Sequence, residues 1–130
     1  MQAEQKLSPS ALRDYDAIRE TIQHYIQGGK TGNTEEMKLA FHEQATIFGY
    51  IGPDLFAGPI QGLFDWNDQN GAATELEGGV TSIDLVGTVA TARIELDNWS
   101  GHRFTDFFTL LKVNGEWKVM NKVFYLHPAG

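Results

Sequence analysis

The chain has no cysteine, and it has fewer basic than acidic residues. Without thiols it cannot hold disulfides, cysteine nucleophiles, iron–sulfur clusters or thiolate zinc sites. Ten Lys and Arg residues against 17 Asp and Glu residues give a net charge of -7, and no segment gathers the bases into a cluster. Such a chain repels a phosphate backbone, so we expect no nucleic-acid partner.

Long apolar runs are missing too. No run approaches the roughly 20 residues that a membrane helix needs, and the opening MQAEQKLSPS has no apolar signal core. The four histidines show no metal-ligand spacing and the acids do not converge, so we predict neither a metal site nor a cofactor. These absences favour a soluble, cytoplasmic protein that does not bind membranes.

The first half of the chain has helical periodicity. We expect one domain over residues 1–130, with residues 1–9 as a flexible tail. A helix capped by Ser8 or Ser10 is predicted to end at Gly28-Gly29; its apolar stripe is Leu12, Tyr15, Ile18, Ile22, Tyr25 and Ile26. A second, short helix should follow Asn33 or Thr34, then a strand over 45–50, and a third helix should occupy 59–70.

The second half predicts a meander of four strands, over 80–86, 88–99, 102–113 and 116–126. Ser100-Gly101 and Asn114-Gly115 are two-residue hairpin turns, and such turns fix the strand register. Regular pairing would place Ala92 opposite Thr109 and Phe107 opposite Lys122. Both faces of this sheet are rich in apolar side chains, so each face needs a cover. Helices can cover one face, and a second copy of the chain, in a homodimer, can cover the other.

This order of elements resembles the nuclear transport factor two superfamily. The segment HRFTDFFTLLKVNGEWKVMNKVF, residues 102–124, is most similar to the branch named putative lumazine-binding proteins. HYIQGGKTGN from His24, FHEQATIFG from Phe41 and GTVATARIEL from Gly87 fit the same pattern. The resemblance implies an α+β, cystatin-like and SnoaL-like fold, in which a cone-shaped, curved antiparallel sheet wraps around three N-terminal helices and encloses a pocket.

Ketosteroid isomerases share this fold and use a Tyr, a neutral Asp and an Asp base. The resemblance places their Tyr on Tyr25, their base on Gly49 and their neutral Asp near Thr109. The base carboxylate is therefore absent, which argues against that isomerisation and leaves it uncertain whether the chain is an enzyme. The same alignment implies that the face bearing Thr109, Met120, Lys122 and Phe124 lines the pocket.

Three residues are candidates for catalysis, each with a structural alternative. Tyr25 can donate a hydrogen bond to a ligand oxygen or serve as a core tyrosine. Lys122 can anchor a carboxylate or enolate, act as an amine, or extend its ammonium to the pocket mouth. His42 can be an acid or base near neutral pH, or a histidine at a helix C-terminus.

Asp106 should face away from Lys122, as a polar anchor at the dimer interface or a structural hydrogen-bonded carboxylate. A strand bulge would instead bring its carboxylate to the Lys122 ammonium as a buried pair.

The interpretation is a homodimeric protein that binds a small organic molecule in one largely apolar pocket per subunit. The alternatives are an acid–base isomerase, lyase or cyclase acting on an enolisable or polycyclic substrate, and an interaction module whose outer sheet face binds another protein. The predicted ligand contacts are Tyr25, Trp66, Ala92, Ile94, Phe107, Thr109, Met120, Lys122 and Phe124, with His42 near the rim. The predicted dimer face is Phe104, Asp106, Phe108, Trp117, Val119, Asn121, Val123 and Tyr125.

Overall fold

A computed structural model describes residues 8–129 of the chain, so residues 1–7 of the predicted tail lie outside the described residues. The helices are α1 (Pro9–Thr31), α2 (Thr34–Lys38) and α3 (Gln61–Asn70). The strands are β1 (Phe41–Ile51), β2 (Asp54–Pro59), β3 (Glu77–Val86), β4 (Val89–Trp99), β5 (His102–Val113) and β6 (Glu116–Leu126). None of the helices in this part of the chain has the length and apolar character needed to cross a bilayer.

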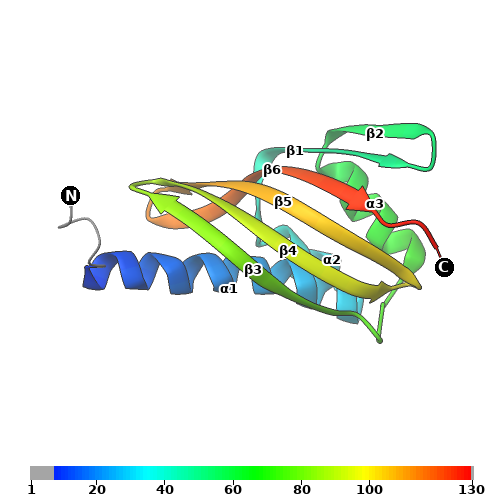
Figure 1. The fold of residues 1–130 in the computed structure, drawn as a ribbon, viewed down its shortest axis with the longest axis horizontal. Helices are drawn as coiled ribbons and strands as arrows, with labels where there is room; N and C mark the ends of the chain where they lie inside the picture. Colours follow the sequence, from blue (N-terminus) through cyan, green and yellow to red (C-terminus); the bar gives the residue numbers. More distant parts are fainter. Residues whose placement is uncertain (1–7, 130) are drawn as a thin grey trace.

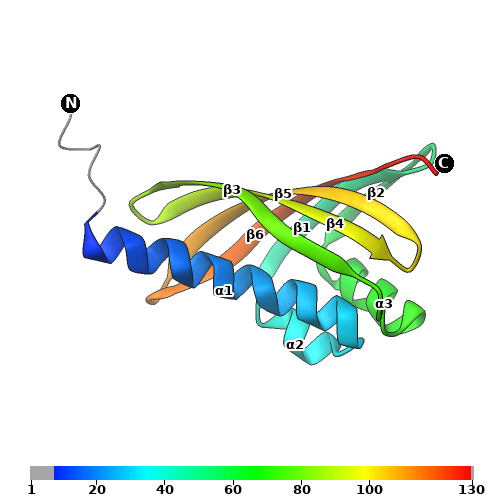
Figure 2. The ribbon, with the colours of Figure 1, turned by 60° about the horizontal axis from the view of Figure 1, so that its bottom comes forward.

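The six strands form one curved sheet in the order β2-β1-β6-β5-β4-β3 (Figure 1). Neighbouring strands are antiparallel except β1 and β6, which run parallel. All three helices lie on the same side of the sheet, and the opposite side carries no helix from residues 8–129 (Figure 2). The predicted α+β class, with helices packed into the curve of a sheet, is confirmed.

α1 is longer than its sequence pattern predicted. The Ser8 side chain caps its start by accepting from the Ala11 amide at 3.1 Å, and Gly32, with a φ of 74°, ends it. The predicted end at Gly28-Gly29 is wrong, because both glycines lie inside the helix. A Cβ on Gly28 would come within 2.5 Å of the Met37 Cβ, so this glycine is needed for the close approach of α2 to α1.

The predicted strand register holds beside both hairpin turns and shifts further along. In β4, two residues between Leu96 and Trp99 oppose one residue of β5, and Asn98 there has a φ of 59°. In β6, Met120 is an extra residue between Asn121, which pairs with Thr109, and Val119, which pairs with Leu110. Both irregularities are β-bulges, which insert one unpaired residue and change the faces on which later side chains lie.

The two bulges correct the predicted pairings. Ala92 lies opposite Phe108 and not Thr109, and Phe108, not Phe107, lies opposite Lys122. As a result, five residues predicted for the outer dimer face lie beneath the helices: Phe104, Asp106, Phe108, Trp117 and Val119. Trp117 illustrates the packing, since its indole N–H donates to Asp14 of α1 at 3.0 Å. Phe107, predicted to line the pocket, is instead 55% exposed, and Thr109 is exposed beside it.

Candidate functional site

A cavity opens between the curved end of the sheet and helices α1 and α3. Its volume is about 90 Å³, and its wall is mostly apolar and aromatic. The lining residues come from α1, α3 and every strand except β3: Tyr25, Ile47, Ile51, Phe56, Leu63, Trp66, Trp99, His102, Phe104, Lys122, Phe124 and Leu126. Ile51 and His102 are exposed and mark the mouth, whereas Tyr25 and Lys122 form the polar part of the wall.

Tyr25, Asp106 and Lys122 form a buried polar cluster beside this cavity. The Tyr25 hydroxyl donates to Asp106 Oδ2 at 2.5 Å, and Lys122 Nζ lies 3.9 Å from the same oxygen. Tyr25 and Asp106 are 0% exposed and Lys122 is 5% exposed. A phenol, a carboxylate and an amine thus meet at one oxygen atom, a combination that can hold or move a proton.

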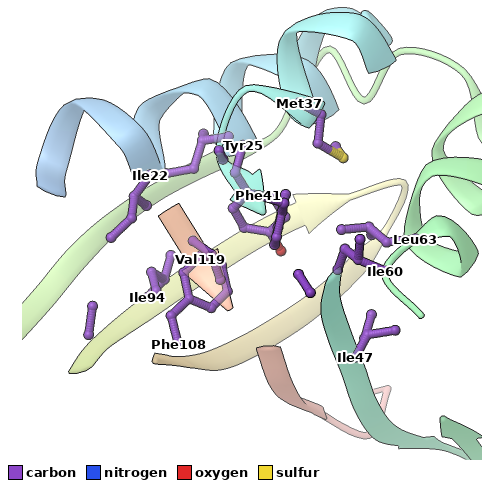
Figure 3. Packing of buried hydrophobic residues seen from close by; sticks show 14 of the residues in the cluster. Ile22, Tyr25, Met37, Phe41, Ile47, Ile60, Leu63, Ile94, Phe108 and Val119 are labelled. Carbon is purple, nitrogen blue, oxygen red and sulfur yellow. The ribbon is translucent and has the colours of Figure 1, made fainter. Parts of the chain in front are cut away.

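The cluster is surrounded by aromatic rings. The Tyr25 ring packs against Phe41 and Phe108, with centroid distances of 5.7 and 5.2 Å; Figure 3 shows these three residues in the interior. Lys122 Nζ lies 5.1 Å from the centroid of the Tyr25 ring and 5.3 Å from that of Phe124. These faces stabilise an ammonium by cation–π attraction, although they cannot accept its protons as oxygen atoms would.

Burial shifts the pKa of all three groups toward their neutral forms. It raises the pKa of Asp106, against the opposing effects of the Lys122 ammonium and the Tyr25 hydrogen bond. It lowers the pKa of Lys122, opposed by the Asp106 charge, and it raises the pKa of Tyr25 well above its usual value, an effect that the neighbouring Asp106 adds to. The neutral and the ionised forms of the Asp106–Lys122 pair are therefore brought closer in free energy than they are in water.

The hydrogen-bonding capacity of the cluster is not used up. Asp106 Oδ1 is buried and has no hydrogen-bond partner among residues 8–129, and Asp106 Oδ2 lies 3.9 Å from Lys122 Nζ, beyond hydrogen-bond distance. A buried carboxylate oxygen without a donor is costly and is uncommon in native proteins. This feature distinguishes the cluster from a fully satisfied structural ion pair.

The bulge at Met120 explains why Asp106 and Lys122 meet. Regular pairing would place Asp106 opposite Val123, on the other face from Lys122. With Met120 inserted, Asp106 lies opposite Phe124, so its side chain shares the inner face with Lys122 and Phe124. The alternative in which a bulge brings the two charges together is the arrangement that forms.

The structure places the predicted site residues in four different settings besides the outer face. Tyr25, Trp66, Lys122 and Phe124 line the cavity, whereas Ala92 and Ile94 are buried in the core and are not among its lining residues. Met120 is half-buried at the bulge. His42, which lies in β1 and not at a helix end, does not line the cavity, and its Nδ1 accepts from the Gln44 amide at 3.0 Å.

Several lining residues were not anticipated from the sequence. Phe56 lies on β2, a strand that was not predicted, and Phe104 was assigned to the wrong face by the regular register. Trp99 could have been anticipated, because it is a large aromatic residue next to the Ser100-Gly101 turn, at a hairpin end that folds toward the helices. Its indole N–H is buried and without a partner among the described residues.

The position of the isomerase base leaves no room for a carboxylate. A Cβ on Gly49 would lie 2.5 Å from the ring of Phe124, which packs directly over the β1 backbone. The carboxyl group beside Tyr25 comes from Asp106 and not from the vicinity of Thr109, which lies on the outer face. The site therefore pairs its carboxyl with an amine instead of with a second carboxylate.

Comparison with known proteins finds a family and close structural relatives. The family model described as "Putative lumazine-binding" matches residues 13–125. An NTF2-like protein of unknown function from Methylobacillus flagellatus KT is 48% identical, with a TM-score of 0.88 over 95% of this chain and 97% of that chain. Another from Shewanella baltica OS155 is 44% identical, with a TM-score of 0.87 over 95% and 100% of the two chains.

A curated relative has a named activity. The protein called aldolase FrzH, from a Cladobotryum species, is 28% identical over 116 residues, which is 88% of this chain and 93% of that protein.

Proposed function

The chain belongs to the putative lumazine-binding family, and on this premise we propose that it binds a small organic molecule in the cavity beside Tyr25 and Lys122. The observation that carries the proposal is the combination of an apolar, aromatic wall with one cluster of polar groups. Binding sites for small molecules have this composition, because the apolar wall supplies affinity and a few polar groups fix orientation.

The wall chemistry favours a flat, largely apolar ligand with one polar end. Phe104 and Trp66 lie edge to face, with centroids 6.5 Å apart, and Phe104 packs against Phe124 in the same manner at 5.9 Å. Such rings offer surfaces on which a planar ligand can stack. The polar end of the ligand would point to Lys122, the cation of the wall.

Closing the cavity mouth tests this site directly. We expect Ile51→Trp to reduce ligand affinity at least about tenfold, because the larger ring would fill the entrance at a position that is already 41% exposed. The measurement is native mass spectrometry of the co-purified ligand, followed by titration of that ligand. Val86→Trp is the matched control, since Val86 is 75% exposed and does not line the cavity. Equal affinity of the two variants would contradict the assignment.

A second candidate function is acid–base catalysis in the same cavity. The observation that favours it is the buried Asp106–Lys122 pair, in which burial raises the pKa of Asp106 and lowers the pKa of Lys122. The similarity to a protein called an aldolase is consistent with this candidate. Its substrate would be an enolisable carbonyl compound or a polycyclic precursor, acted on by an isomerase, lyase or cyclase.

The outer face of the sheet supports a further proposal, a homodimer packed sheet to sheet. Six large apolar side chains on neighbouring strands of this face are 40–62% exposed: Phe48, Tyr50, Leu55, Phe107, Val123 and Tyr125. In the register, Phe48 lies opposite Val123 and Val123 opposite Phe107, so the side chains form a continuous row. A second copy presents the same row, which makes the surface self-complementary.

A charge in this row should separate the subunits. We expect Val123→Lys to convert a dimer into a monomer, because each copy would bury an unpaired ammonium in the interface. Size-exclusion chromatography with light scattering measures the mass, and Val86→Lys, at the exposed end of β3, should leave the dimer intact. A wild-type protein that stays monomeric at high concentration would refute the dimer and leave the face available to a different protein.

A further inference from the structure

Lys122 is the cationic side chain of the cavity wall, and it is held in an unusual state. Its side chain is 6% exposed and lines the cavity, yet its nearest anionic partner, Asp106 Oδ2, is 3.9 Å away. This separation is longer than a hydrogen bond between charged groups, which is about 2.7–2.9 Å. A structural lysine would be paired more closely or extended to solvent.

The surroundings of Lys122 favour a reactive amine. Aromatic rings of Tyr25, Trp99 and Phe124 lie with their centroids 5.1–6.0 Å from Nζ, and their faces offer it no oxygen acceptor. The other titratable groups near it are Asp106 on β5, Tyr25 on α1 and His102 at the mouth. Nucleophilic lysines in enzymes are activated by the same kind of desolvation in an apolar site.

We infer that Lys122 forms a Schiff base with aldehydes or ketones that enter the cavity, and that Asp106 carries the proton between nitrogen and oxygen. The inference rests on the proposed binding function and adds to it a substrate class, small carbonyl compounds with an apolar body. Three features of the geometry carry it: an amine at the cavity wall, a buried acid beside it, and a free oxygen atom on that acid among the described residues.

The step begins with proton transfer from the Lys122 ammonium to the Asp106 carboxylate, which frees the lone pair on nitrogen. Nζ then attacks the carbonyl carbon; a C–N bond forms, the C=O π electrons move to oxygen, and a proton passes from nitrogen to that oxygen to give a carbinolamine. Asp106 next protonates the hydroxyl group, the C–O bond breaks and water leaves. The nitrogen lone pair completes the C=N bond, so ammonium and carbonyl become protonated imine and water.

The charge at the site is the same before and after this step. The protonated imine carries the single positive charge that the ammonium carried, and Asp106 is again a carboxylate. The buried ion pair therefore persists, and no uncompensated charge is left in the apolar interior. The Tyr25 hydroxyl remains hydrogen-bonded to Asp106 throughout, which makes Tyr25 a positioning residue for the acid.

Reductive trapping with benzaldehyde as the probe tests the inference. Sodium cyanoborohydride reduces an imine to a stable secondary amine, which adds one benzyl group to the intact mass. Peptide mapping of the wild-type protein then compares Lys122 with Lys30, an exposed lysine of α1. At neutral pH we expect Lys122 to react at least about tenfold faster than Lys30, because a larger share of its amine is unprotonated.

Variants separate the reactive amine from simple binding. Lys122→Met should abolish the fast label and Lys30→Met should retain it. Asp106→Asn removes the charge that raises the pKa of Lys122, so more of the amine is unprotonated, yet labelling should be slower because the acid that protonates the departing hydroxyl group is lost. Quenching of Trp66 and Trp99 fluorescence by benzyl alcohol, which has no carbonyl group, reports binding alone. If benzyl alcohol binds but the benzaldehyde label is spread evenly over the lysines, the inference is overturned and the binding function stands. If neither probe binds, both proposals fail.

Discussion

Asp106→Asn should lower the free energy of unfolding by about 3 kcal/mol at neutral pH. The amide keeps an acceptor for the Tyr25 hydroxyl, so the hydrogen bond now measured at 2.5 Å can persist. What is lost is the negative charge that compensates Lys122, whose side chain is 6% exposed. An ammonium left alone in the interior must either remain desolvated or give up its proton, and both outcomes cost stability. Urea unfolding followed by circular dichroism measures the change.

The double variant distinguishes this cause from general disruption of the core. Adding Lys122→Met to Asp106→Asn removes both charges, so the double variant should be more stable than Asp106→Asn alone. Asp16→Asn is the matched control, because it makes the same substitution in an exposed ion pair with Arg19 at 3.5 Å. That control should change stability by less than about 0.5 kcal/mol. If the double variant lost as much unfolding free energy as Asp106→Asn and Lys122→Met lose together, the two groups would not be coupled.

The sequence predicted the elements of the fold better than their pairing. The bounds of β5 and β6 agree with the expected ranges, because Ser100-Gly101 and Asn114-Gly115 are residue pairs that favour two-residue hairpin turns and so mark the strand ends. β2 was missed since its six residues, Asp54–Pro59, include a proline and a glycine, which disfavour a strand. Its pairing with β1 is a tertiary contact that a local pattern does not encode.

The site was predicted only in part, for a geometric reason. Tyr25 and Trp66 lie on helices and were placed at the cavity by helix periodicity and the family resemblance, whereas Lys122 and Phe124 were placed there by the strand face that the resemblance assigned to the pocket. Asp106 and Phe104 depend on the register of β5, and one extra residue at Met120 reverses the face of each. A bulge is a single-residue irregularity with no required side chain at such a position, so alternation along the strand could not reveal it.

Gly28→Ala should destabilise the protein by about 3 kcal/mol, although alanine is normally favoured over glycine inside a helix by about 1 kcal/mol. The added Cβ would lie 2.7 Å from the Met37 backbone nitrogen, and backbone atoms cannot yield as a flexible side chain can. Moving α2 aside would disturb Asn67, which donates to the Gly28 carbonyl at 3.3 Å and to Thr34 at 3.0 Å.

Gly79→Ala is the control, since a Cβ added there would meet no atom within 4 Å and the φ of Gly79 is not in the left-handed region. Thermal and urea unfolding should show a large loss of stability for Gly28→Ala and a change within about 0.5 kcal/mol for Gly79→Ala. A gain of stability in Gly28→Ala would mean that helix propensity outweighs the contact with α2, and that this contact is loose enough to adjust.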